Sequence, residues 1–182
     1  MKSAARALFF CIAASACQLQ AEPVQFQYPG GELWAEFSYT DGKIEGTRRE
    51  YYKNGVLKMQ QQYSAGILNG ISIKYFESGR VLCEEHYKNG KRDGVCRVYY
   101  ANGRLKAEMQ FAGGRLEGPG KAYTEDGSLK GEMQFKNGRL DGISRQYHTS
   151  GSIQYIDRYK DGVMISRTAH APTGSRMPDP QH

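Results

Sequence analysis

Residues 104–127 read RLKAEMQF (104–111), AGGRLEG (112–118), PGKAYT (119–124) and EDG (125–127). In the first segment apolar residues alternate with polar ones, and the apolar side carries Leu105, Ala107, Met109 and Phe111. A period of two predicts a half-buried β-strand. The glycine-rich second segment permits the positive φ angles of a tight reversal, and the third segment is then a shorter strand that ends at Tyr123. Residues 104–127 are therefore predicted to form one β-hairpin.

This hairpin recurs every 24 residues along the chain. Three ladders of glycine keep the period, namely Gly42, Gly66, Gly90, Gly114, Gly138 and Gly162, then Gly46, Gly70, Gly94, Gly118 and Gly142, then Gly31, Gly55, Gly79, Gly103, Gly127 and Gly151. Two aromatic columns keep it as well, namely Tyr39, Tyr63, Tyr87, Phe111, Phe135 and Tyr159, then Tyr51, Tyr75, Tyr99, Tyr123 and Tyr147. A fixed period is the signature of repeat architectures. We predict an all-β protein in which tandem hairpins over residues 28–165 pair edge to edge in a single elongated, twisted antiparallel sheet.

The two aromatic columns indicate how such a sheet could be stabilised. Neighbouring strands lie about 4.8 Å apart, so the rings of one column recur only every ~9.6 Å. If the Tyr39-type and Tyr51-type columns share a face, nearly every strand carries a ring, and offset stacking becomes possible along the array. We therefore expect both columns on the same face.

The two ends of the chain differ from the repeat region. Residues 1–21 carry Lys2, Arg6 and an apolar segment (7–16) about half as long as a membrane span. This pattern is typical of a signal peptide, so we expect cleavage after Ala21 and a periplasmic protein. The alternative is a lipoprotein box, in which a lipidated Cys17 attaches the protein to a membrane. The array is then assigned to residues 22–168, and the polar, proline-containing residues 169–182 to a disordered tail.

Composition and spacing narrow the kinds of site. A formal net charge of +6 without a dense basic patch disfavours nucleic-acid binding. The histidines lack metal-ligand spacing, so we expect no metal, no cofactor and no catalytic residue. The acidic residues before the second glycine of each repeat are interpreted as turn formers that pair with nearby cations. These are Glu45, Asp93, Glu117 and Asp141, with Lys43, Lys91, Arg115 and Arg139.

Two stretches carry a resemblance to a known family. Residues 87–94 (YKNGKRDG) and 135–142 (FKNGRLDG) each contain an aromatic residue, an Asn-Gly turn, then an acidic residue and glycine. This pattern resembles the MORN-repeat variant family, and it covers residues 28–165. The resemblance implies a binding role: bacterial members are commonly antitoxin-like, some exported ones resemble immunity proteins against toxins that include lipase-type effectors, and others are scaffolds or lie against membranes. The family has no shared catalytic residue to assign to this chain.

Cys83 and Cys96 lie on the two predicted strands of one hairpin. If Tyr87 and Tyr99 share a face and no bulge intervenes, strand parity turns the two thiols to opposite faces, where they cannot bond. A bulge would reverse this and allow a disulfide in an oxidising compartment.

Positions that break the columns indicate where a partner could bind. The column of Phe37, Met109 and Met133 holds Gln61, Glu85 and Asp157 in other repeats, and a cation stands two residues before most Tyr51-type rings. Under simple parity this forms a face of rings lined by a broken row of cations, suited to an acidic loop, a phosphate or a lipid head group. The alternative is cross-strand pairing of Arg97 with neighbours such as Glu85. The predicted partner-binding residues are Tyr51, Tyr75, Tyr99, Tyr123, Tyr147, Arg49, Arg97, Lys121, Arg145 and Glu85.

These patterns favour a non-enzymatic, exported binding protein. The first hypothesis is an antitoxin or immunity-type protein that covers the active site of a toxin. The second is an envelope scaffold or membrane-apposed protein. The third, an enzyme, would need a site around His86 or His148. Open sheet ends permit a monomer or a weak dimer.

Overall fold

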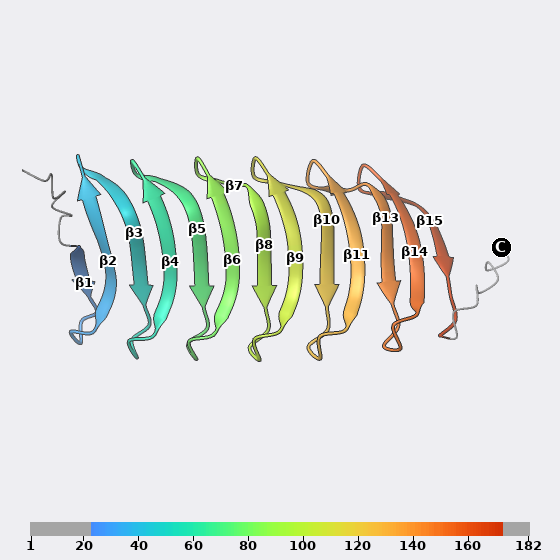
Figure 1. Cartoon of the computed structure of the whole chain (residues 1–182), viewed down its shortest axis with the longest axis horizontal. Coiled ribbons are helices and arrows are strands. Elements are labelled where there is room, and N and C mark those ends of the chain that lie inside the picture. Colours follow the sequence, from blue (N-terminus) through green and yellow to red (C-terminus); the bar gives the residue numbers. More distant parts are fainter. Residues whose placement is uncertain (1–22, 173–182) are drawn as a thin grey trace, which may run out of the picture.

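The computed structural model describes residues 23–172, which form one open antiparallel sheet of 15 strands (Figure 1). The order of the strands in the sheet follows the order of the chain, so each hairpin lies beside the next. Among these residues no helix is long and apolar enough to cross a membrane. The all-β prediction is confirmed. The strands are β1 (Val24–Gln27), β2 (Leu33–Thr40), β3 (Lys43–Tyr51), β4 (Leu57–Ser64), β5 (Ile67–Tyr75), β6 (Val81–Lys88), β7 (Lys91–Arg92), β8 (Gly94–Tyr99), β9 (Leu105–Ala112), β10 (Arg115–Tyr123), β11 (Leu129–Lys136), β12 (Arg139–Leu140), β13 (Gly142–Tyr147), β14 (Ile153–Lys160) and β15 (Val163–Ala169).

Local turn chemistry explains the hairpins. Asn89 and Gly90 both adopt positive φ angles, 50° and 76°, as a two-residue hairpin turn requires. At the other end of the strands, the N–H of Gly103 donates to the carbonyl of Tyr100 at 2.8 Å. Asn102 Oδ1 accepts a bond from the N–H of Arg104 at 2.9 Å, which closes that turn.

The two-residue turn also decides which side chains share a face. Across it Tyr87 pairs with Arg92, and further along the same hairpin Cys83 pairs with Val98. An odd-numbered residue therefore stands beside an even-numbered one, and Tyr99 lies on the face opposite Tyr87. The expectation that the two aromatic columns share a face is wrong. We call the face of Tyr39, Tyr63, Tyr87, Phe111, Phe135 and Tyr159 face A, and the face of Tyr51, Tyr75, Tyr99, Tyr123 and Tyr147 face B.

Ring stacking consequently does not run along the array. Among the described residues, ring–ring contacts are confined to the N-terminal end, where Phe26 stacks on Phe37 at 5.1 Å between centroids and Trp34 and Tyr39 contact these rings edge-on. Burial is concentrated in a row along face A rather than in a layered core. Its buried side chains include Phe37, Ser72, Glu85, Cys96, Ser144 and Asp157.

Three tyrosines of a third column, Tyr28, Tyr52 and Tyr100, bond their own repeat to the next one. The hydroxyl of Tyr52 donates to the carbonyl of Tyr75 at 2.8 Å, and Tyr100 makes the same bond to Tyr123. In the sequence this column is visible as pairs of adjacent tyrosines, such as Tyr51 and Tyr52, because each of its members after Tyr28 directly follows a Tyr51-type residue. Its members are Tyr28, Tyr52, Phe76, Tyr100, Thr124 and His148.

Acidic residues make a second set of bonds between repeats. The carboxylate of Asp93 accepts the N–H of Gly113 at 3.0 Å, and Glu117 accepts the N–H of Asn137 at 2.8 Å. Glu45 and Asp141 do the same for the following turns. The predicted pairing of these acids with Lys43, Lys91, Arg115 and Arg139 is wrong, because the carboxylates accept hydrogen bonds from backbone N–H groups of the next turn instead.

The two cysteines lie on face A in neighbouring strands, not on opposite faces as simple parity predicted. They are staggered, because Cys83 stands opposite Val98 rather than opposite Cys96. Both are free thiols. Burial is the main cause that raises the pKa of each thiol.

The array extends slightly beyond the predicted limits at its C-terminal end. Ala169 belongs to β15, and the N–H of His170 donates to the carbonyl of Gln154 at 2.9 Å. The first residues assigned to the polar tail are therefore part of the sheet. The predicted signal peptide (1–21), with Cys17, and residues 173–182 lie outside the described residues.

Candidate functional site

Face B carries a row of alternating charges. In register across the strands, Glu84 stands beside Arg97, and Arg97 beside Glu108. Lys121 in turn stands between Glu108 and Glu132. The row is interrupted where Gln60 and Ile73 occupy equivalent positions. Its members are Glu36, Arg49, Gln60, Ile73, Glu84, Arg97, Glu108, Lys121, Glu132 and Arg145.

Three of the four cations of this row are paired within the protein. Arg97 Nε donates to Glu108 Oε2 at 2.8 Å, Arg49 Nη1 lies 3.3 Å from Glu36 Oε1, and Lys121 Nζ lies 3.8 Å from Glu132 Oε1. Surface pairs of this kind contribute about 0–1 kcal/mol each. The alternative of cross-strand pairing is therefore realised, but with acids of face B and not with Glu85.

Tyrosine hydroxyls complete the same row. Tyr51 donates to Glu36 at 2.7 Å, Tyr99 to Glu84 at 3.1 Å, and Tyr147 to Glu132 at 2.9 Å. Burial, and then the bond to Glu36, raises the pKa of Tyr51 to about 12. The same bond is the main cause that lowers the pKa of Glu36. Nine of the ten predicted partner-binding residues thus lie on one face, and the polar groups of many of them are already engaged.

Glu85, the tenth, belongs to face A. It is buried, with Arg92 Nη2 at 2.7 Å and Lys74 Nζ at 3.7 Å from its carboxylate oxygens, and the hydroxyl of Tyr87 donates to it at 3.3 Å. Arg92 also lies over the ring of Phe111 at 5.3 Å. A buried carboxylate needs such partners, so Glu85 is a structural ion-pair centre and not part of the cation-lined face.

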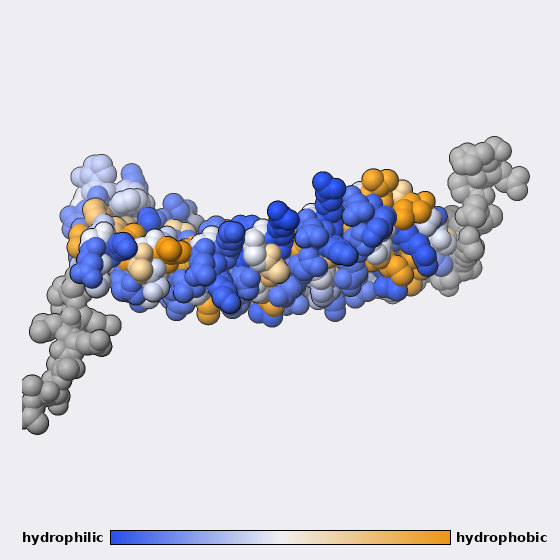
Figure 2. All heavy atoms as spheres, turned by 90° about the horizontal axis from the view of Figure 1, so that it is seen from above, coloured by the Kyte–Doolittle hydropathy of each residue, from blue (hydrophilic) through white to orange (hydrophobic). Residues whose placement is uncertain are grey.

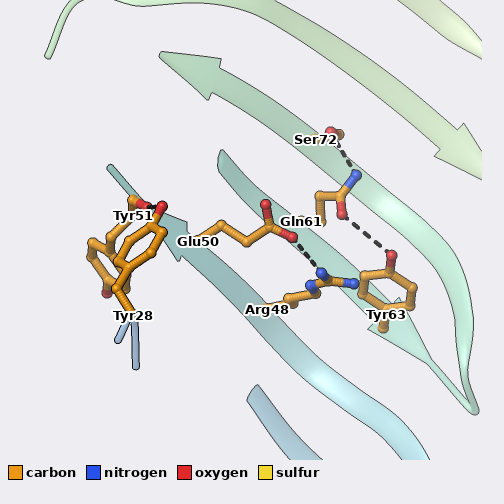
Figure 3. A network of polar contacts seen from close by, with 7 residues as sticks. All are labelled: Tyr28, Arg48, Glu50, Tyr51, Gln61, Tyr63 and Ser72. Carbon is orange, nitrogen blue, oxygen red and sulfur yellow. Dashed lines mark hydrogen bonds and ion pairs between the residues drawn. The ribbon is translucent and has the colours of Figure 1, made fainter. Parts of the chain in front are cut away.

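A polar network covers the N-terminal part of face A (Figure 3). Tyr63 donates to Gln61 Oε1 at 3.2 Å, and Gln61 Nε2 donates to Ser72 Oγ at 3.3 Å. Beside it Arg48 pairs with Glu50. Gln61, the polar side chain that breaks the apolar column in this region, is therefore supplied with partners, whereas Nε of Arg48 is buried without one.

The next part of face A, over β8–β13, carries no ionisable side chain other than the Cys96 thiol. We call it the uncharged stretch, and its residues are Gly94, Cys96, Val98, Leu105, Ala107, Met109, Phe111, Leu116, Gly118, Gly120, Ala122, Leu129, Gly131, Met133, Phe135, Leu140, Gly142, Ser144 and Gln146. It is bounded by the Glu85 cluster on one side. On the other side lies the buried Asp157, which binds Arg167 through two bonds of 2.8 Å.

A hollow of about 330 Å³ lies over β10–β14, where residues of the uncharged stretch meet Lys130, Arg145, Tyr147 and Gln154. Gly131 lines it, where other repeats place Ala35, Met59, Cys83, Ala107 or Tyr155. Glycine at a strand position outside the turn ladders was the sequence signal for this hollow, and sequence reasoning missed it. Its lining residues are Ala122, Lys130, Gly131, Met133, Ser144, Arg145, Gln146, Tyr147 and Gln154.

Neither strand histidine contributes to a cluster of reactive groups. His86 Nδ1 lies 2.8 Å from the carbonyl of Val95, and His148 Nε2 lies 3.1 Å from the carbonyl of His170. Within residues 23–172, no three His, Cys, Asp or Glu side chains are grouped to hold a metal ion. What the described part of the chain presents is two solvent-facing surfaces of a single sheet.

Comparison with known proteins agrees with this architecture. No curated protein gives a significant match to the chain. The sequence model of the MORN repeat variant matches five tandem segments, residues 44–65, 68–89, 92–112, 116–137 and 140–161. Each match runs from about one two-residue turn, such as Asn89-Gly90, to the next turn of the same kind. Together the matches span more than half of the chain. This protein belongs to the MORN repeat variant family.

Proposed function

We propose that this protein is an exported, non-enzymatic binding protein that neutralises a toxin by covering its active-site opening. The observation that carries the proposal is the uncharged stretch of face A. It presents the half-buried side chains of Met109 and Phe111 on β9 and of Met133 and Phe135 on β11, and within residues 23–172 no second layer covers them. Uncovered apolar surfaces of this kind mark interaction sites.

The chemistry of the stretch favours a particular class of toxin. An enzyme that takes lipid substrates has an apolar rim around its active site, and an uncharged face buries such a rim without leaving an unpaired ion. Each carboxylate of the flanking clusters already has a cation, since Glu85 is held by Arg92 and Lys74 and Asp157 by Arg167, so these pairs need not be broken on binding. The hollow at Gly131, whose lining includes Lys130 and Arg145 beside Met133, would receive a partner side chain with a polar end as an anchor. A lipase-type effector delivered into the cell envelope fits this description.

Export is part of the proposal. The leader at residues 1–21 would bring the protein to the periplasm, where such a toxin acts. The mass of the protein recovered from the envelope tests this, because cleavage after Ala21 leaves Glu22 as the first residue and the alternative leaves a lipidated Cys17.

The binding test is co-expression with the product of the neighbouring gene, followed by co-purification and a growth assay. Met109→Lys places a charge on the uncharged stretch, whereas Gln110→Lys places the same charge on face B of the same strand. We expect Met109→Lys to weaken binding more than tenfold and Gln110→Lys to leave it unchanged. If the protein neither binds nor protects against any envelope toxin encoded nearby, the proposed function is wrong. If both variants weaken binding equally, face A is not the binding surface.

A second candidate function rests on the N-terminal end of the sheet. Val24, Phe26, Trp34 and Tyr39 are exposed there, close to where a lipidated Cys17 would attach. Aromatic side chains of this kind favour the membrane interface, so we also propose a membrane-apposed scaffold. Flotation with vesicles that contain anionic lipid tests it, and a protein that stays at the bottom of the gradient at low salt excludes it.

A further inference from the structure

The last strand of the sheet exposes more apolar side chain than any other strand described. Val163, Met164 and Ile165 are consecutive and are 68%, 44% and 66% exposed. They lie at the C-terminal end of the array, where Figure 2 shows hydrophobic residues gathered beside hydrophilic neighbours. Elsewhere in residues 40–162 the large exposed hydrophobic residues are Ile67 and Ile71, which are separated in the chain and each follow a glycine.

β15 is also an open edge. Within residues 23–172 it pairs with β14 on one side only, so half of its backbone N–H and C=O groups point away from the described sheet. Natural edge strands are usually short or carry proline or free lysine, which prevent pairing with another chain. β15 has seven residues, contains neither, and its single charge at Arg167 is held by Asp157.

The end of this chain is poorly suited to cover the edge. Ten residues follow the described part of the chain, and they include Pro178 and Pro180. Proline has no backbone N–H and does not complete a sheet ladder. A strand from another molecule is the better fit.

The direction of the edge strands decides which edges of two copies can pair as antiparallel strands. Successive strands of the path are antiparallel, and β1 and β15 are its first and thirteenth members, so they run in the same direction. Stacking copies head to tail would therefore place β15 beside β1 of the next copy as parallel strands. A twofold axis perpendicular to the sheet places β15 beside β15 as antiparallel strands, which is the pairing used throughout this molecule.

We propose that two copies of this protein associate through β15 into one continuous sheet. Pairing centred at Ser166, next to the irregularity at Ile165 where the register with β14 shifts, brings Ile165 of each copy near Arg167 of the other, so no like charges meet. The same axis keeps face A of both copies on one side, which leaves both uncharged stretches free. This inference does not depend on the proposed toxin partner.

The test is the mass of the full chain and of three variants, measured by sedimentation velocity over a wide concentration range. Ile165→Lys adds a cation near Arg167 of the other copy, and Ile67→Lys adds the same charge at a similarly exposed position inside the array. Phe26→Lys places it near the other edge. We expect a dimer for the wild type, Ile67→Lys and Phe26→Lys. Because the two like charges repel each other, Ile165→Lys should raise the dissociation constant by more than tenfold.

Hydrogen exchange gives a second readout that needs no variant. In the dimer, amides of β15 that point outward should lose protection when the wild-type protein is diluted, while those of β10 should not change. A monomeric wild type overturns the proposal. So does a dimer that Ile165→Lys leaves intact or that Phe26→Lys dissociates, or open-ended oligomers in place of a closed dimer.

Discussion

Replacing Asp157 by asparagine should be among the most destabilising isosteric changes in this protein. Its carboxylate is 1% exposed and receives Nε and Nη2 of Arg167, each at 2.8 Å. The asparagine amide can accept one of these bonds, but its NH₂ group meets the other donor. A hydrogen bond to a charged group contributes about 1.5–3 kcal/mol, and water does not reach this site to replace it. We therefore expect a loss of about 2–3 kcal/mol in the free energy of unfolding.

A matched control is available on face B. Arg97 Nε bonds Glu108 Oε2 at the same distance of 2.8 Å, but this carboxylate is 37% exposed. Water can replace the lost contact there, so Glu108→Gln should cost about 0–1 kcal/mol.

The assay is urea unfolding of the wild type and both variants, followed by circular dichroism. Hydrogen exchange of the β15 amides should locate the effect of Asp157→Asn at the C-terminal end, because Arg167 is the anchor of that strand. If Glu108→Gln costs as much as Asp157→Asn, or if Asp157→Asn costs less than about 1 kcal/mol, burial of the carboxylate is not what gives the pair its strength.

Phe76→Tyr should add the hydroxyl bond between repeats that its column makes elsewhere, and raise the free energy of unfolding by about 0.5–1.5 kcal/mol; unchanged urea midpoints would contradict this. Tyr51 should titrate near pH 12 by ultraviolet absorbance. Since its folded pKa lies above the ordinary value of 10.0, its contribution to stability should be complete below about pH 10 and vanish as the pH rises through 12. Tyr51→Phe should raise the pKa of Glu36, as measured by NMR. Because that pKa is lowered in the folded wild type, the free energy of unfolding should fall as acid protonates Glu36. This fall should be smaller in the variant. Cys83 and Cys96 should both react with a thiol reagent after unfolding, but only slowly in the native protein at neutral pH because their pKa values are raised; a disulfide found by mass spectrometry would refute the register.

Much of the architecture follows from local chemistry and is visible in the chain itself. A pair such as Asn89 and Gly90 forms a two-residue hairpin turn because both residues tolerate positive φ angles. A period of 24 residues without insertion then repeats the same hairpin, and each hairpin lacks a partner until the next one pairs with it. Strand type, repeat length and family membership therefore needed no coordinates.

Which residues share a face of the sheet was harder to predict from the sequence. Whether Tyr87 and Tyr99 share a face depends on which residues stand opposite each other across the turn. That register is set by pairing between strands, and a wrong assumption moved Glu85 and the cation of Arg97 onto one surface. The partners of the acidic side chains could not be predicted from the sequence either, since Asp93 accepts a bond from a backbone N–H twenty residues ahead and does not pair with its basic neighbour Lys91.

The chain by itself determined a periodic all-β array, because periodicity and turn chemistry act over a few residues. Only the tertiary structure decided which side chains meet: the charge row of face B, the uncharged stretch of face A and the exposed edge at β15. These depend on register and on where the array stops. The last repeat continues directly from Val163 through Met164 to Ile165, without the acid and glycine that stand at Asp141 and Gly142 one repeat earlier. Ile165 and Ser166 stand in their places, and Val163, Met164 and Ile165 are exposed to solvent.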